Sequence, residues 1–151
     1  MTEIGLPLSR VVDGCLLLQF KNDTAGFEAG QRELHAFLEA QGVSDRGLYR
    51  SELAFEELVV NVIRHGRGDL DTGAHAIDVS VRMCDEDILL TVEDDGPPFN
   101  PLKVPDPPRP STIEDARIGG LGLPLVRFAA KRIEYERTAG RNRVMMSIQR
   151  N

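Results

Sequence analysis

The sequence contains no tryptophan, only two cysteines and no long run of apolar residues. Its longest wholly apolar runs are far shorter than the roughly 20 residues that a membrane-spanning helix needs. Its N-terminus also lacks a basic segment followed by an apolar one, which a secretory signal would require. We therefore expect a cytoplasmic protein that does not contact a membrane.

Positive charge is scarce as well, because the formal net charge is −6. A protein that binds duplex nucleic acid needs a basic face to neutralise phosphates. We therefore expect no direct contact with nucleic acid. The net charge does not argue against binding a single nucleotide, for which a few placed groups suffice.

The two cysteines, Cys15 and Cys84, each lie in an apolar, strand-like context. Neither belongs to a CxxC pair or to a Cys/His cluster, which are the spacings typical of redox and zinc sites. Reduced thiols in the protein core are the expected state in the cytoplasm. Metal ligation by cysteine is not expected.

What is present is an ordinary globular composition, with 41% hydrophobic and 28% charged residues in a chain of 151. A chain of this length can bury a core large enough to fold unaided. We therefore expect one domain over residues 1–151.

Short segments that alternate apolar and polar residues predict antiparallel strands joined in hairpins. Each is bounded by turn residues such as Asp, Gly and Asn. The predicted strands are a first strand or hairpin within 11–20, a hairpin of 76–84 with 87–92, and a hairpin of 133–138 with 143–148. Residues 139–142 are expected to form the last turn.

Three further segments predict helices, because apolar residues recur on one face between capping and stop signals. They cover about 23–41, 44–66 and 122–132, with Asp23 or Thr24 and Ser44 or Asp45 as N-caps and Gly42 as the first stop. Strands and helices do not alternate as in a doubly wound sheet. The predicted fold is therefore α+β: a two-layer sandwich in which about three helices cover one face of a mostly antiparallel sheet.

The helical segment 51–66, SELAFEELVVNVIRHG, carries two unexpected polar residues. Glu57 and Asn61 stand one turn apart on the same face, and apolar residues occupy much of the remaining circumference. A buried carboxylate or amide without partners costs roughly 1–3 kcal/mol. One interpretation is that both residues face a solvent-filled edge or cap a loop, and this segment taken alone favours it. The other is that they belong to a functional site.

The segment 92–101, VEDDGPPFNP, ends a strand in a sharp acidic turn. Taken alone it is a surface turn, because DDG and PP are common loop sequences. The alternative is a carboxylate that accepts a hydrogen bond from the exocyclic amine of a purine, held close to the bare backbone of Gly96. Adenine suits this arrangement, since its N6 amino group donates where guanine presents a carbonyl oxygen.

The segment 117–127, RIGGLGLPLVR, places three glycines before a helix. Bare N–H groups at the positive end of a helix dipole form an anion site. The segment is neither a P-loop nor a Rossmann fingerprint, because no GK[ST] follows and no strand precedes it. The proline-rich and charged residues 100–118 before it are either a surface excursion or a lid that closes over phosphates.

Together the three segments resemble the N, G1 and G2 boxes of the GHKL ATP-binding superfamily, the histidine-kinase-like ATPase domains. Within it, the chain is most similar to bacterial anti-sigma-factor serine kinases, and the resemblance covers nearly the entire chain. No dimerising histidine hairpin precedes the first box, so a complete sensor kinase is not expected. The residues that carry the resemblance are Glu57, Asn61, His65 and Gly66, then Asp94, Gly96, Pro98 and Phe99, then Gly119 to Leu123.

The resemblance implies a role for each of these positions. Asn61 would hold Mg²⁺, Asp94 would bind the adenine amine of ATP, and Gly96 would lie against the face of the adenine. Glu57 would be the catalytic base, and Arg117 would contact the γ-phosphate from a lid at 100–118. The remaining ATP-binding residues that it implies are Phe99, Gly119, Gly120, Leu121, Gly122 and Leu123.

The function implied is that of an ATP-binding anti-sigma regulatory factor, acting as a serine-protein kinase on a STAS-type anti-sigma antagonist. The other implied partners are a sigma factor and a second copy of the chain in a homodimer. Two alternatives stay open. One is an ATP-binding partner-switching module that sequesters a protein without phosphoryl transfer, and the other is a free-standing GHKL ATPase.

Overall fold

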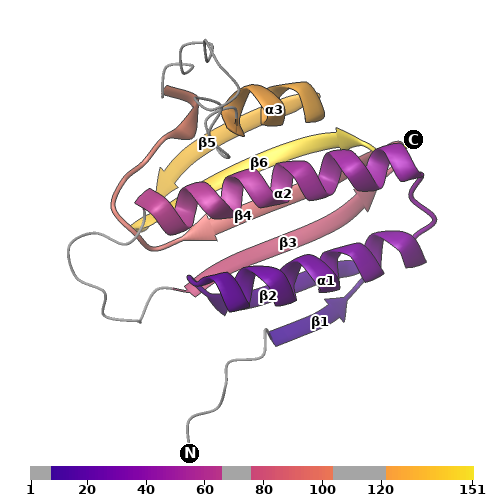
Figure 1. Cartoon of the computed structure of the whole chain (residues 1–151), viewed down its shortest axis with the longest axis horizontal. Coiled ribbons are helices and arrows are strands. Elements are labelled where there is room, and N and C mark those ends of the chain that lie inside the picture. Colours follow the sequence, from indigo (N-terminus) through magenta and orange to yellow (C-terminus); the bar gives the residue numbers. More distant parts are fainter. Residues whose placement is uncertain (1–7, 66–75, 104–121) are drawn as a thin grey trace, which may run out of the picture.

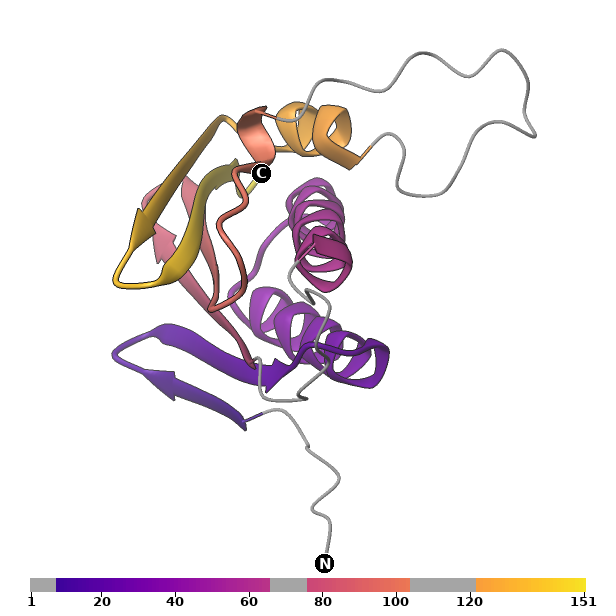
Figure 2. The same ribbon diagram turned by 90° about the vertical axis from the view of Figure 1, so that its left-hand side faces the viewer.

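The computed structural model of the chain describes residues 8–65, 76–103 and 122–151. These parts form two layers, a six-stranded antiparallel sheet and a layer of helices on one of its faces (Figure 1 and Figure 2). The other face of the sheet carries no helix in this part of the chain. The arrangement confirms the predicted two-layer α+β sandwich.

The sheet has the strand order β1-β2-β3-β4-β6-β5, and every neighbouring pair is antiparallel. The last turn is shorter than predicted, because only Ala139 and Gly140 form it, with left-handed φ angles of 53° and 76°. Two such residues match the twist of a hairpin, and Asn142 therefore belongs to a strand. The strands are β1 (Leu8–Val12), β2 (Cys15–Lys21), β3 (Ala76–Cys84), β4 (Asp87–Asp94), β5 (Arg132–Thr138) and β6 (Arg141–Gln149).

The helices begin at two of the predicted caps. The Asp23 carboxylate accepts a hydrogen bond from the Gly26 N–H at 2.7 Å, and the Ser44 hydroxyl accepts one from the Gly47 N–H at 3.2 Å. None of the described helices is long and apolar enough to cross a bilayer. The helices are α1 (Thr24–Ala40), α2 (Asp45–His65) and α3 (Gly122–Ala129), with a short 3-10 turn, η1 (Pro101–Lys103).

Helix α3 ends three residues earlier than predicted, at Ala129. The backbone N–H of Lys131 donates to Ser147 O of β6 at 2.8 Å, and β5 begins at the next residue. The N–H of Lys131 is therefore hydrogen-bonded to the sheet, whereas in a longer helix it would bond within the helix.

The core lies between the helix layer and the facing side of the sheet. Along β2, β4, β6 and most of β3, every second residue is buried, as the alternating patterns predict. Phe55 of α2 is fully buried in this core. The centroid of its ring lies 5.7 Å from the ring centroid of Phe27 and 6.1 Å from that of Phe20. Fully burying such a side chain stabilises the fold by about 1.5–3 kcal/mol. Helix α2 is therefore held firmly over the central strands.

Both cysteines are free, and the prediction that they lie in the core is wrong: Cys84 is exposed, and Cys15 is half-buried outside the core. The register explains the difference. Leu16 faces the helices, so its neighbour Cys15 faces the uncovered side of the sheet, and Cys84 follows the same alternation at the end of β3. Alternation places successive side chains on opposite faces.

Candidate functional site

A cavity of about 400 Å³, including its open mouth, lies between α2, β4, β6 and the segment that follows β4. Its walls are mainly apolar, and its polar members are an aspartate and two asparagines. The lining residues are Leu58, Asn61, Val62, Val92, Asp94, Pro97, Phe99, Pro101, Asn142 and Val144. Three of the predicted ATP-binding residues, Asn61, Asp94 and Phe99, therefore border one cavity.

Asp94, the last residue of β4, is 6% exposed and faces the helix layer. Its Oδ2 atom accepts hydrogen bonds from the Gly96 N–H at 3.0 Å and from the side-chain nitrogen of Asn142 at 3.2 Å. Burial raises the pKa of Asp94, and the two hydrogen bonds and the Arg137 charge oppose that rise. The result is a desolvated carboxylate with acceptor capacity on a largely apolar wall.

Helix α2 brings Asn61 to the cavity, where this residue is half-buried. Glu57, one turn earlier, is 8% exposed but does not line this cavity. Burial raises the pKa of Glu57, the charge of Glu56 raises it further, and Arg64 opposes the shift. A buried carboxylate with a raised pKa is a stronger base than an exposed one, which suits it to accept a proton.

The segment after β4 closes one side of the cavity. Gly96 is buried, and its carbonyl accepts a hydrogen bond from Arg137 at 2.8 Å. The backbone N–H of Phe99 donates to the side-chain oxygen of Asn142 at 3.1 Å, and Pro101 is buried at the start of η1. Side chains of β5 and β6 therefore hold this segment against the sheet.

The predicted phosphate-binding residues lie largely outside the described parts. Arg117, Gly119, Gly120 and Leu121 are not among the described residues, nor are residues 104–118 of the predicted lid. Gly122 and Leu123 are the first two residues of α3, so the glycine-rich segment does lead into a helix, as predicted.

Three polar residues of the site were not predicted: Asn142 on β6, and Tyr135 and Arg137 on β5. A signal for Asn142 was present, because alternation traced back from Met146 and Val144 places it on the buried face. For Tyr135 and Arg137 no local signal exists, since β5 lacks a clear alternation of buried residues.

A family model described as a histidine kinase-like ATPase domain matches residues 20–148. Among curated proteins, the chain is 28% identical over 97 residues to the serine/threonine-protein kinase BtrW of Bordetella bronchiseptica. The match covers 63% of this chain and 66% of BtrW, so the chain spans just under two thirds of that relative's length.

Two solved structures are similar. The histidine kinase AdeS of Acinetobacter baumannii has a TM-score of 0.48 and 17% identity, over 94% of this chain and 69% of that one. The RsbU and RsbW domains of Rv1364c from Mycobacterium tuberculosis have a TM-score of 0.61 and 13% identity, over 89% of this chain and 32% of that one. The second similarity shows a shared fold.

Proposed function

The chain belongs to the histidine kinase-like ATPase domain family, and from this premise we propose that it is an ATP- and Mg²⁺-dependent protein serine kinase with an anti-sigma regulatory role. Its substrate would be a STAS-type anti-sigma antagonist, and its other partner a sigma factor. The similarity to BtrW, a serine/threonine-protein kinase, supports the transfer step. The proposal treats residues 1–151 as one domain whose lid is 100–118.

The observation that carries this proposal is that Asn61 and Asp94 border the same cavity. They come from a helix and from the end of a strand, 33 positions apart in the sequence. The apolar walls suit the faces of a purine, and the Asp94 carboxylate suits its exocyclic amine. Phe99 and the buried Gly96 would lie against the base.

The donor set also suits Mg²⁺. Among the described residues, no group of three or more His, Cys, Asp and Glu side chains could hold a metal ion. Mg²⁺ commonly takes most of its ligands from phosphates and water, with only one or two from protein. The side-chain oxygen of Asn61 would be that protein ligand, and the bound ion would neutralise charge on the phosphates.

Glu57 is assigned the role of general base. It would take the proton from the substrate serine hydroxyl as that oxygen bonds to the γ-phosphorus and the bond from this phosphorus to the leaving oxygen of ADP breaks. Its raised pKa makes it a stronger base than an exposed glutamate. Phosphate contacts are assigned to Arg117 and to Gly119, Gly120, Leu121, Gly122 and Leu123, as the sequence motif indicates.

The direct test is transfer of labelled γ-phosphate from ATP to a purified STAS-domain antagonist. We expect transfer by the wild type and a rate lower by about 10²- to 10⁴-fold in Glu57→Gln, which is the usual contribution of a general base. Glu28→Gln is the matched control, because it makes the same change at an exposed position on α1. Absence of transfer by the wild type, or equal transfer by Glu57→Gln, would overturn the kinase assignment.

Two outcomes of this experiment would identify the alternatives. ATP-dependent capture of the partner without phosphate transfer would indicate a sequestering switch. Steady phosphate release in the absence of any protein acceptor would indicate a free-standing ATPase.

We also infer that two copies of the chain associate through β1. All five residues of this edge strand are exposed, and Leu8 and Val11 among them are 69% and 59% exposed. An edge strand with exposed apolar side chains is a template for pairing with another chain. This supports the homodimer that the family resemblance implies.

A further inference from the structure

The side chain of Asn142 uses its full hydrogen-bonding capacity within the protein. Its nitrogen donates to Asp94 Oδ2 at 3.2 Å and to Pro97 O at 2.8 Å, and its oxygen accepts from the Phe99 N–H at 3.1 Å and from the Tyr135 hydroxyl at 2.6 Å. An amide offers two donors and two acceptor positions. Asn142 is 4% exposed and lines the cavity, yet it has no group left to bind a ligand.

The orientation of this amide follows from its partners. The backbone N–H of Phe99 can only donate, and the carbonyl of Pro97 can only accept. The oxygen of Asn142 must therefore face Phe99 and the nitrogen must face Pro97. The nitrogen is then the group beside Asp94, where it donates to the carboxylate.

The carboxylate of Asp94 is consequently used on one side only. Oδ2 accepts from both Asn142 and the Gly96 N–H, whereas Oδ1 accepts no hydrogen bond from any residue that the structure describes. Asp94 lines the cavity, so Oδ1 is the acceptor left for a ligand. A single fixed acceptor selects a ligand that donates at that point and rejects one that presents a carbonyl oxygen.

Strand β5 supports this arrangement from the edge of the sheet. The Tyr135 hydroxyl donates the second hydrogen bond to the side-chain oxygen of Asn142, and Arg137 donates to the carbonyl of Gly96 at 2.8 Å. The register brings these residues together, because Asn142 pairs with Asp94 on one side and with Arg137 on the other. Strand β6 thus contacts the Asp94 carboxylate directly through Asn142, and β5 supports it indirectly through Asn142 and Gly96.

We propose that Asn142 and Tyr135 are positioning residues for base recognition: they hold Oδ2 of Asp94 so that Oδ1 alone meets the exocyclic amine of the purine. This inference rests on the proposed function, since it concerns the same nucleotide site. Without the Asn142 amide, the carboxylate can rotate and the segment at Pro97 and Phe99 loses its link to β6. Without the Tyr135 hydroxyl, the amide keeps only one of its two acceptor contacts.

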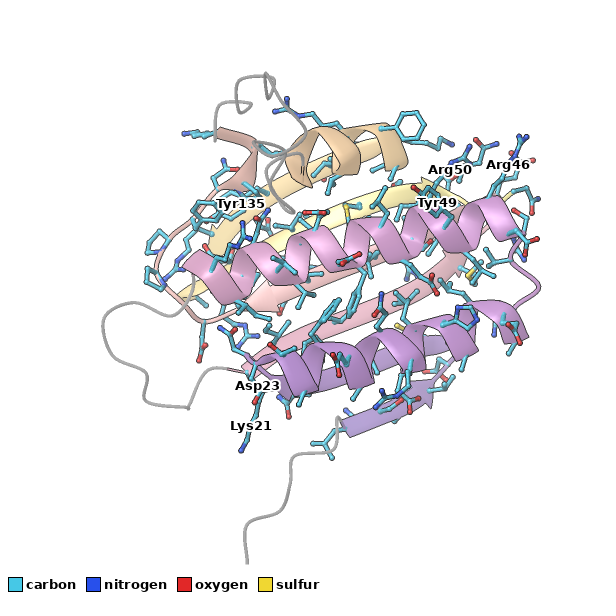
Figure 3. The ribbon with its side chains drawn as sticks, viewed as in Figure 1. Lys21, Asp23, Arg46, Tyr49, Arg50 and Tyr135 are labelled. Carbon is cyan, nitrogen blue, oxygen red and sulfur yellow. The ribbon has the colours of Figure 1, made fainter. Side chains whose placement is uncertain are left out.

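The test compares the binding of ATP with that of purine riboside triphosphate, which lacks the 6-amino group. The chain contains only two tyrosines, Tyr49 and Tyr135, which supply a matched pair of variants. Tyr49 is 63% exposed near the start of α2, and Figure 3 shows it well separated from Tyr135, which lies on β5. We expect wild type and Tyr49→Phe to prefer ATP by about 10-fold or more, as a hydrogen bond to a charged group provides.

Tyr135→Phe should weaken ATP binding severalfold and leave binding of the amine-free nucleotide unchanged, so the preference shrinks. Asn142→Ala should abolish the preference, and if that variant does not fold, Tyr135→Phe decides. A merely structural role would weaken both nucleotides equally and keep the preference, and that result would overturn the inference. Binding of neither nucleotide by the wild type would overturn the proposed function and this inference together.

Discussion

Asn142 on β6 stands directly opposite Asp94 on β4, and its side-chain nitrogen donates to the Asp94 carboxylate across 3.2 Å. The two residues are 48 positions apart, so strand pairing and no local interaction brings them together. The contact holds the carboxylate on the wall of the cavity that Asn61 also borders.

Asp94→Asn should weaken ATP binding by about 10- to 100-fold, because a hydrogen bond to a charged acceptor contributes roughly 1.5–3 kcal/mol. The variant should be at least as stable as the wild type, since it removes a desolvated charge. Calorimetric titration and thermal unfolding measure the two effects. Glu93→Gln is the control, because Glu93 pairs with Arg141 and Arg143 instead of lining the cavity. Undiminished ATP binding by Asp94→Asn would contradict the assignment.

Glu57→Gln should raise the free energy of unfolding at pH 7. The pKa of Glu57 is raised by burial above its ordinary value of 4.5, so the charged form destabilises the folded state. That effect is fully present above the raised pKa and disappears below the unfolded value. Urea unfolding at several pH values should therefore show a gain that shrinks as the pH falls towards 4. A gain of the same size at pH 4 and pH 7 would argue against a desolvated carboxylate.

His35→Gln should destabilise the protein more at pH 6 than at pH 9. The imidazole of His35 links α1 to α2, because Nδ1 contacts Glu52 and Nε2 lies 3.1 Å from Glu39. Hydrogen bonding and charge attraction from Glu52, with a smaller effect of Glu39, raise the pKa of His35 above 6.5. The stabilisation is complete below the unfolded pKa and is lost as the pH rises through the folded one.

Thermal unfolding across this pH range measures the His35 effect. Glu52→Gln should cause most of the pH-dependent loss of stability that His35→Gln causes, and Glu39→Gln should cause less of it. The reason is that Glu52 is the main cause of the raised pKa of His35. Equal losses of stability for His35→Gln at pH 6 and pH 9 would show that the pair carries no titrating interaction.

Val11→Lys should shift the protein from dimer to monomer in sedimentation velocity. Val11 is 59% exposed on the edge strand β1, and a charge at an edge discourages strand pairing. Phe128→Lys is the control, because it removes a 77% exposed apolar side chain from α3 instead. A wild type that is monomeric at all concentrations, or a Val11→Lys dimer as stable as the wild type, would refute association through β1.

Elements whose signals are local were predictable. The caps at Asp23 and Ser44 act within three residues, and a left-handed glycine at Gly42 follows the end of α1. The alternation in β3 and β4 likewise reports burial directly, since every second side chain faces the helices. These features depend on neighbours in the chain and on little else.

Features that depend on pairing between distant segments were not predictable. Asn142 lies in the predicted turn 139–142. Alternation traced back from Val144 indicates that it is buried, but its partners on β4 and β5 are selected by strand register, which no local pattern shows. The core position predicted for Cys84 rests on its apolar context, whereas the local alternation along β3 puts it on the uncovered face of the sheet. The local pattern shows that one face is buried, but not which layer covers it.

By itself, the sequence determined the kinds and order of the elements and the residue types available for nucleotide chemistry, because caps, turns and periodicity act over a few neighbouring residues. Only the tertiary structure decided that Asn61 and Asp94 border one cavity and that Asn142 has no hydrogen-bonding group to spare. The reason is physical: the packing of α2 on the sheet and the β4–β6 register join segments that no local interaction connects.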